Sequence, residues 1–162
     1  MNIAITIKVI ALVALCAIPI SLILLSINRK KKQTKKELFA FANESKCTIS
    51  QSDSWGTTCI GIDETNKILF FAKKPDVQPI KISLCEVTQC KLIPEHYKNG
   101  DSKTGQPSAQ HIFLELTLSI GLQQKIMFEF YNLVQDFNEF DGRYHLASKW
   151  QKIITTYINS KQ

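Results

Sequence analysis

The sequence predicts a mainly β fold with helices, of the α+β class. It is expected to be an antiparallel barrel or two packed sheets of six to seven strands, capped by a C-terminal amphipathic helix and preceded by a transmembrane helix. Three patterns carry this prediction: an apolar run at residues 9–27, alternating segments between residues 47 and 132, and helical apolar spacing at residues 142–159. The expected parts are a short tail at 1–8, a transmembrane helix at 9–28, a basic juxtamembrane segment and linker helix at 29–46, and a folded domain at 47–162.

The apolar run at residues 9–27 is long enough to cross a membrane. It has no ionisable side chain except Cys16, and at about 1.5 Å per residue it spans roughly 28 Å, close to the hydrocarbon thickness of a bilayer. Two other interpretations are a cleaved signal peptide, with Lys8 as its charged region, and a lipoprotein signal processed at Cys16. The apolar core of a signal peptide is shorter, about 7–15 residues, and Leu15 is bulky where lipoprotein signals have a small residue. The run therefore favours a permanent anchor.

A block of basic residues sets the expected orientation. Only Lys8 precedes the apolar run, whereas six Lys and Arg residues follow it within eight positions. Because loops rich in Lys and Arg stay on the cytoplasmic side, we expect a single-pass cell-membrane protein with its N-terminus outside and its C-terminal domain in the cytoplasm. The same side chains are the expected contacts with anionic lipid: Arg29, Lys30, Lys31, Lys32, Lys35 and Lys36.

The charge of the folded domain argues against a nucleic-acid partner. The whole chain has a net charge of +6, but seven of its 20 Lys and Arg residues precede residue 37. Residues 37–162 contain the remaining 13 Lys and Arg residues and all 14 Asp and Glu residues, so their net charge is −1. A domain that binds nucleic acid usually has a basic patch, so a nucleic-acid partner is not expected.

Four cysteines lie in the domain: Cys47, Cys59, Cys85 and Cys90. In a reducing cytoplasm they are expected to be free, buried thiols. If the topology is reversed, an extracytoplasmic domain with two disulfides is the alternative. Their spacing lacks the paired two-residue gaps of a zinc ribbon, so no metal is expected.

The first half of the domain contains a helix signal followed by strand signals. Thr34 and Glu37 have the spacing of a capping box, which predicts a helix at about residues 35–45. Residues 51–56, after a β start at 48–50, are expected to form a polar turn. Residues 57–63 and 67–73 then predict a hairpin around a turn at 63–66.

The second half continues the alternation and ends in a helix. Residues 80–84 and 87–92 predict two short strands or one bent strand, and residues 94–110 predict a mobile loop. Residues 112–119 and 126–131 form the clearest hairpin. A helix is expected at about 142–159 with Asp141 as its N-cap. Its apolar face consists of Leu146, Ala147, Trp150, Ile153, Ile154, Tyr157 and Ile158.

This order of elements resembles a pleckstrin-homology-like (PH-like) domain across roughly residues 47–159. Residues 80–87, Ile-Lys-Ile-Ser-Leu-Cys-Glu-Val, are similar to the strand, tight turn and strand of bacterial members, many of which are tethered by transmembrane helices. The resemblance implies a fold used mainly as a binding module. Members that bind phosphoinositides have several bases in the loop between the first two strands. Here that loop is expected at residues 51–56, which contain no base, so inositol phosphate is not expected.

Candidate catalytic residues are few and scattered along the chain. Asp53 and Ser54, with one of His96, His111 and His145, make up the alternative of a small enzyme at the membrane surface. No Gly-x-Ser-x-Gly elbow or glycine-rich phosphate loop accompanies them. The chain is therefore not expected to be an enzyme, and no cofactor is expected.

Three aromatic residues are candidate partner contacts: Trp55, Phe137 and Phe140. Trp55 is expected in a turn, where it is either exposed to a partner or folded back into the domain. Phe137 and Phe140 precede the last helix, and packing beneath that helix is the alternative for both. The favoured function is a membrane-anchored binding or scaffold module with a protein partner at the cytoplasmic face.

Overall fold

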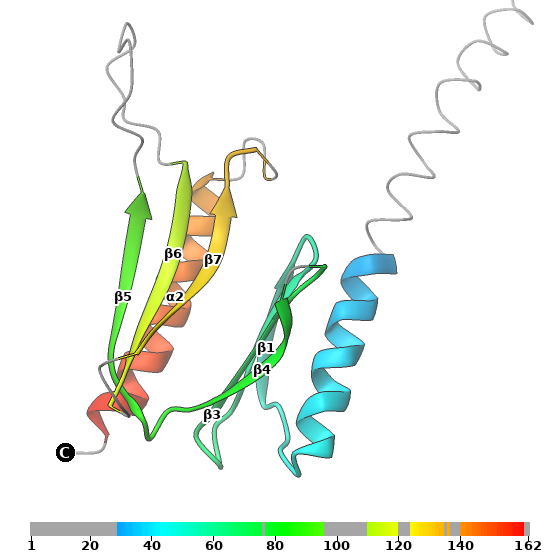
Figure 1. Ribbon diagram of the computed structural model, residues 1–162, viewed down its shortest axis with the longest axis vertical. Coiled ribbons are helices and arrows are strands. Elements are labelled where there is room, and N and C mark those ends of the chain that lie inside the picture. The colour runs from blue at the N-terminus through cyan, green and yellow to red at the C-terminus, as the bar shows by residue number, and fades with distance from the viewer. Residues whose placement is uncertain are drawn as a thin grey trace, which may run out of the picture. The chain divides into compact units, whose positions relative to one another are not determined.

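The computed structural model describes residues 29–75, 77–95, 110–119, 124–134, 136 and 140–160, with Val77 described by its main chain alone. In this part of the chain, a helix at residues 29–44, which we term the N-terminal helix, precedes seven strands and a C-terminal helix (Figure 1). The strands and the last helix are β1 (Gln51–Trp55), β2 (Thr58–Asp63), β3 (Ile68–Lys73), β4 (Val77–Ser83), β5 (Val87–Glu95), β6 (His111–Leu118), β7 (Lys125–Asn132) and α2 (Phe140–Asn159).

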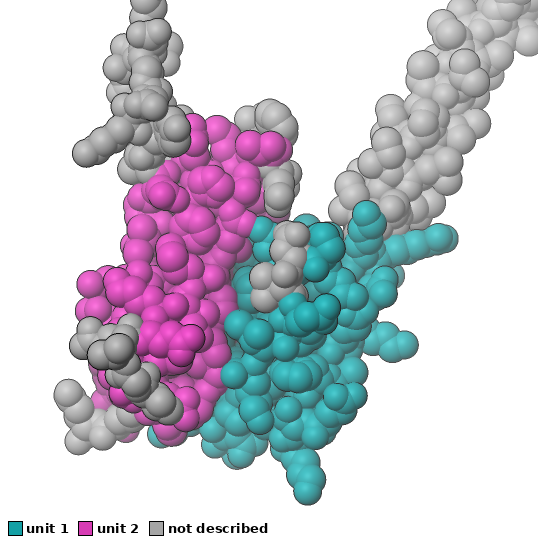
Figure 2. Space-filling model, viewed as in Figure 1, with its two compact units in different colours: residues 1–81 teal, residues 82–162 magenta. Residues whose placement is uncertain are grey.

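The seven strands form two antiparallel sheets, one in the order β1-β2-β3-β4 and the other in the order β5-β6-β7. The predicted α+β class is therefore confirmed, with a four-stranded sheet, a three-stranded sheet and a C-terminal helix. The chain divides into two compact units, residues 1–81 and 82–162, with the boundary inside β4 (Figure 2).

The first unit is built around the predicted hairpin of β2 and β3, which is confirmed. Register pairs such as Ile60 with Phe71 place large apolar side chains opposite one another. All six residues of β2 are buried. Because successive strand residues point to opposite faces, this strand has buried side chains on both faces of the sheet. Gly61 fits this setting, since a Cβ there would lie 2.9 Å from the Cγ2 atom of Ile49.

Strand β1 corrects the predicted polar turn at residues 51–56. Residues Gln51 to Trp55 pair with β2 along their whole length, and Trp55 lies opposite Thr58. The turn between the two strands is shorter than expected and contains Gly56, whose φ of +48° suits glycine, which has no Cβ to oppose it. The uniformly polar residues before Trp55 hid an edge strand, because the first four side chains of β1 are only half-buried.

The second unit consists of the three-stranded sheet and α2, which packs on β5, β6 and β7. The predicted hairpin of β6 and β7 is confirmed, and the predicted face of α2 is confirmed at its centre. Ala147, Trp150 and Ile154 are each 0% exposed. The spacing of three and four residues puts these side chains on one stripe of the helix, which faces the sheet.

Two predicted boundaries are wrong in detail. Pro94 and Glu95 belong to β5 and pair with β6, so the loop expected from residue 94 begins later, and residues 96–109 lie outside the described part. Proline is compatible with this position because β5 is an edge strand. Asp141 lies in the first turn of α2 and does not precede it. A carboxylate there still favours the positive end of the helix dipole.

Candidate functional site

The N-terminal helix presents the six predicted lipid contacts on its surface, and all six side chains are exposed. Along one stripe of the helix, Thr34, Leu38 and Ala42 follow one another at intervals of four residues and are buried. The Thr34 hydroxyl donates to the main-chain oxygen of Lys30 over 3.1 Å. The predicted capping box is therefore wrong, because Thr34 lies inside a helix that already includes Arg29. Besides its basic side chains, this helix has a stripe of buried residues that packs on the first sheet.

Apolar contacts fasten the helix to the first sheet. The cluster of buried residues at this contact consists of Leu38, Ala42, Cys47, Cys59, Phe70 and Ala72. Phe41 adds an edge-to-face contact with Phe70, with ring centroids 6.2 Å apart and planes at 85°. Burial of a Leu side chain stabilises a contact by about 1.5–3 kcal/mol. The helix that carries the basic side chains is thus packed on the first sheet.

An ion pair adds a polar contact between the helix and the sheet. The Glu37 carboxylate binds the ammonium group of Lys74, which follows β3, and accepts a hydrogen bond of 3.0 Å from the amide group of Gln33. The hydrogen bond from Lys74 is the main cause that holds the pKa of Glu37 below its ordinary value. Both side chains are about one-third exposed, so this pair is worth at most about 1 kcal/mol.

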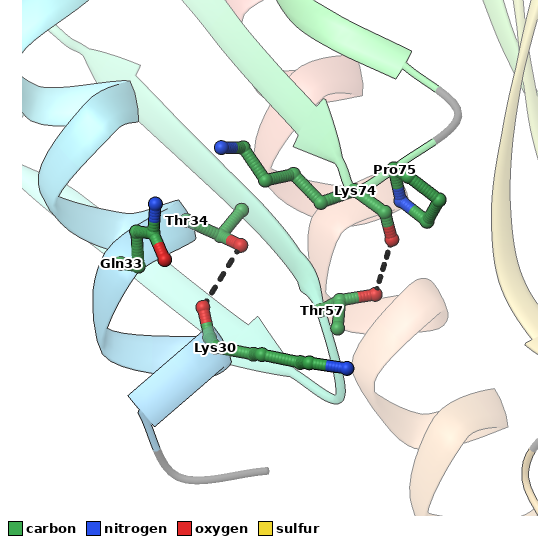
Figure 3. Close-up of a pocket in the computed structure, with 6 residues that line it drawn as sticks. All are labelled: Lys30, Gln33, Thr34, Thr57, Lys74 and Pro75. Atoms are coloured by element: carbon green, nitrogen blue, oxygen red, sulfur yellow. Dashed lines mark hydrogen bonds between the residues drawn. The ribbon is translucent and has the colours of Figure 1, made fainter. Parts of the chain in front are cut away.

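One flank of the helix borders a pocket of about 290 Å³, which we term the Thr57 pocket (Figure 3). It is lined by Lys30, Gln33, Thr34, Thr57, Lys74 and Pro75. The Thr57 hydroxyl donates to the main-chain oxygen of Lys74 over 2.6 Å, and the Thr34 hydroxyl is likewise bonded to a carbonyl. In Figure 3 the side chains of Lys30 and Lys74 extend in opposite directions. With the Lys74 charge balanced by Glu37, Lys30 supplies the remaining positive charge of this lining.

The other flank borders a larger hollow of about 440 Å³, which we term the β1 groove. It is lined by Lys31, Lys32, Lys35, Ser52, Asp53 and Ser54. The lining therefore combines three exposed lysines with three residues of the edge strand of the first sheet, one of which is acidic. The β1 groove therefore gathers more lysines than the Thr57 pocket on the other flank.

A buried thiol lies next to this groove. The Sγ atom of Cys59 is 3.4 Å from the Oγ atom of Ser54, and either atom can be the donor. Burial raises the pKa of the Cys59 thiol, and the Ser54 hydrogen bond and the charge of Lys35 oppose this effect without cancelling it. A thiol held in its protonated form is a weak nucleophile, so Cys59 contributes packing at this position.

The candidate catalytic residues are placed separately. Asp53 and Ser54 are neighbours in β1 and so point to opposite faces of the strand. In the second unit, His111 bonds through Nδ1 to Glu129 over 2.9 Å and stacks on Phe113. His145 contacts the ring of Tyr144 in α2, and His96 lies outside the described residues. Among the described residues, Ser54 is bonded to a thiol and has no histidine partner.

The predicted aromatic contacts differ in exposure. Trp55 is only 5% exposed, which agrees with the alternative that its ring folds back into the domain. Phe140 is half-buried at the start of α2, edge-on to Tyr131 at 5.4 Å and stacked on Tyr144. Phe137 lies outside the described residues.

The remaining expected features concern cysteines, metals and the membrane. Cys47, Cys59, Cys85 and Cys90 are free thiols in the structure, but the expected burial is wrong for two of them, since Cys85 is exposed and Cys90 is half-buried. Within the described ranges, no cluster of three or more His, Cys, Asp and Glu side chains has the arrangement of a metal site. Nor does this part of the chain include a helix of sufficient length and apolarity to span a bilayer. The predicted transmembrane helix at 9–28 lies outside it.

No protein-family model, curated protein or solved structure matches this chain. The function of these residues must therefore be inferred from their geometry and charge. The lysines of the β1 groove were predicted from the sequence as lipid contacts, but the residues of β1 that line the groove with them were not predicted. The lining contributed by β1 was hidden because residues 51–54 have no apolar side chain to indicate a strand.

Proposed function

We propose that this chain is a single-pass membrane protein whose PH-like domain acts as a binding or scaffold module for a protein partner at the cytoplasmic face. One observation carries the proposal. The helix that follows the predicted span is already helical at Arg29, continues to residue 44, and is packed on the first sheet through its buried stripe. A domain attached in this way has a defined orientation at the membrane.

The arrangement of strands supports the PH-like assignment. Four strands in one sheet and three in the other, followed by a C-terminal helix, fit the order that the resemblance implies. The turn between β1 and β2 consists of Gly56 and Thr57 and contains no base. The proposal therefore does not include inositol phosphate as a ligand.

The exposed bases support contact with the membrane itself. Basic residues beside an anionic membrane each contribute on the order of 1 kcal/mol of attraction. The six side chains of the block surround the helix on all sides except its buried stripe. Those nearest the span can face lipid headgroups while the others face the domain.

The near-neutral charge of the folded domain supports a protein partner over nucleic acid. Confinement to a membrane also favours binding, because it raises the effective concentration of a weak partner without any new contact. An enzyme would need catalytic groups that converge, and Asp53 and Ser54 point to opposite faces of β1.

Crosslinking in intact cells tests the proposal. The tagged full chain is treated with formaldehyde, and captured proteins are identified. The control is a chimera in which residues 1–44 are fused to an unrelated soluble domain, so that proteins captured through the anchor alone are recognised. We expect a defined partner that requires residues 45–162. Capture of the same proteins by the chimera, or turnover of a substrate by the full chain without any partner, would contradict the module.

A further inference from the structure

We propose that the β1 groove binds an acidic, extended segment of the partner protein, which lies along the edge of β1 with its carboxylates toward the lysines of the N-terminal helix. This proposal rests on the proposed function and names the chemistry of the partner. It is drawn from the lining of the groove, which combines three exposed lysines with the edge strand of a sheet.

The charge of the groove selects an acidic ligand. Lys31 and Lys35 are four residues apart, so they lie one above the other on the same side of the helix. Lys32 extends the positive surface, and Lys35 is positioned with its ammonium group 5.4 Å from the ring centroid of Phe39. Asp53 contributes the one carboxylate of the lining. An acidic segment thus finds an excess of positive charge, while a basic or neutral segment does not.

The strand edge selects an extended ligand. β1 is an edge strand of the four-stranded sheet, and its three central residues line the open hollow. An edge strand has main-chain N–H and C=O groups directed away from its neighbour, which can pair with an added strand. The ligand therefore gains main-chain hydrogen bonds from β1 as well as ion pairs from the helix.

Residues repeat at similar intervals along the helix and along β1. Lys31 and Lys35 are separated by about 6 Å along the helix axis, at 1.5 Å per residue. Ser52 and Ser54 are separated by about 6.6 Å along β1, at 3.3 Å per residue. In an extended peptide, residues i and i+2 are about 6.6 Å apart and share one face. Two carboxylates at these positions can therefore reach the two lysines together.

A lipid headgroup would use only half of this lining. A single phosphate can bind the lysines, but it has no row of main-chain groups to pair with β1. The Thr57 pocket on the opposite flank shows the contrast, since it offers lysines without a strand edge and one of them is already paired with Glu37. The combination of charge and strand edge favours a peptide segment.

The binding test uses the full chain in nanodiscs of neutral phosphatidylcholine. The probe is a fluorescent heptapeptide that alternates Glu and Thr, and its affinity is measured by fluorescence anisotropy. The double variant Lys31→Gln with Lys35→Gln should bind about tenfold more weakly, because two charge-assisted contacts are lost. The matched control is Arg29→Gln with Lys36→Gln, which removes the same charge from the same helix at positions that do not line the groove. It should change the affinity by less than about twofold.

Two altered peptides test the chemistry of the ligand while leaving the protein intact. Replacing each Glu of the peptide by Gln should weaken binding about tenfold if carboxylates pair with the lysines. Methylation of the alternate main-chain nitrogens should weaken it by a similar factor, about tenfold, if the peptide adds to β1 as a strand. Circular dichroism of each protein variant verifies that the fold is retained.

Several results would overturn the groove as a peptide site. Equal losses in the two double variants would mean that general charge attraction, and not the groove, binds the peptide. Undiminished binding of the methylated peptide would exclude strand addition. If the groove variant lost affinity for phosphatidylglycerol vesicles but kept its affinity for the peptide, the groove would be a headgroup site. If the groove variant captured the same partner as the natural chain in the crosslinking experiment, the peptide site would be refuted but the proposed function would stand. If the natural chain captured no partner, the proposed function itself would be refuted.

Discussion

At the scale of single residues, the N-terminal helix ends with an unusual residue for its backbone conformation. The amide of Cys47 donates to the carbonyl of Ala42 and that of Lys46 donates to Asn43, each over 2.9 Å. These two bonds form a Schellman motif, a six-residue helix end whose fifth residue is usually glycine. Here it is Lys46, with a φ of +57°. The contact between Ala42 and Cys47 in the buried cluster accompanies the motif and holds it in place.

Lys46→Gly should therefore stabilise the first unit. A side chain in the left-handed region costs roughly 1–2 kcal/mol that glycine does not incur, although glycine also loses more entropy on folding. We expect a gain of about 0.5–1 kcal/mol in the free energy of unfolding. The measurement is urea unfolding followed by the fluorescence of Trp55 in a Trp150→Phe background. Lys46→Ala is the control and should gain nothing, so an equal gain there would contradict the backbone explanation.

Asp63 holds the hairpin between β2 and β3 through its carboxylate. It accepts hydrogen bonds from the amide of Thr48 at 2.7 Å and from the amide and side chain of Asn66 at 2.8 Å each. Burial alone would raise the pKa of Asp63, but these hydrogen bonds outweigh it and hold the pKa below its ordinary value of 3.8. Because the folded pKa is the lower one, this carboxylate stabilises the fold above pH 3.8 and loses its contribution as the pH falls through the lowered value.

Asp63→Asn should cost about 1–3 kcal/mol at pH 7, because an amide group cannot accept from all three donors. The difference from the natural chain should shrink as the pH falls below 3.8. Urea unfolding at a series of pH values measures both effects. The neighbouring exposed residue gives the control, Glu64→Gln, which should change little. A difference between Asp63→Asn and the natural chain that is the same at low and neutral pH would contradict a role for the charge.

At the scale of elements, the packing of the N-terminal helix is the contact on which the proposed function depends. Leu38 is 0% exposed within the cluster that joins the helix to the first sheet. Leu38→Ala should lower the free energy of unfolding by about 2–5 kcal/mol, because the cavity cannot close completely. Trp55 fluorescence during urea unfolding reports the loss. Lys36→Ala, on the exposed surface, should be nearly neutral, and an equally small effect of Leu38→Ala would show that the helix does not pack as described.

The second helix gives a parallel test in the other unit. Trp150 is 0% exposed at the centre of the face that α2 packs on its sheet. Trp150→Ala should cost about 3–5 kcal/mol. Circular dichroism during urea unfolding measures the change, with the exposed Lys152→Ala as the control. A loss below about 1 kcal/mol would be too small for a side chain buried in this way.

The elements that could be predicted from the sequence are those with a clear apolar pattern. Strands β6 and β7 and the helix α2 bury apolar residues at regular intervals, so periodicity identifies them. Strands β2 and β3 are instead largely buried runs on either side of a turn, and that turn identifies them. Strand β1 has no such difference before Trp55, because an edge strand can leave both faces polar. The first turns of the N-terminal helix were missed for a similar reason, since their only buried side chain is that of Thr34.

The site could be predicted only in part because it combines two distant segments. The lysine block is visible in the sequence as a membrane signal. That Lys31 and Lys35 face the middle of β1 depends on how Leu38 and Ala42 pack, which is a property of the folded unit. No local pattern relates residue 31 to residue 52.

At the scale of the whole molecule, we propose a membrane anchor joined to a folded module. The basic block has two roles in it. In the proposal, its charge sets the topology, and its helix positions three lysines beside β1. The first role requires the folded domain to lie on the cytoplasmic side, where a reducing environment would keep the cysteines as thiols. The orientation is therefore the central claim.

Thiol labelling in intact cells tests this claim most directly. Cys85 is the exposed cysteine among the described residues, whereas Cys47 and Cys59 are buried, and burial raises the pKa of Cys90 to about 12. A membrane-impermeant maleimide should therefore leave Cys85 unlabelled until the membrane is permeabilised, and Cys85→Ser should abolish the signal that then develops. Asn2→Cys in that background is the converse control and should be labelled from outside. Labelling of Cys85 in intact cells, with protection of the cysteine at position 2, would contradict the proposed topology.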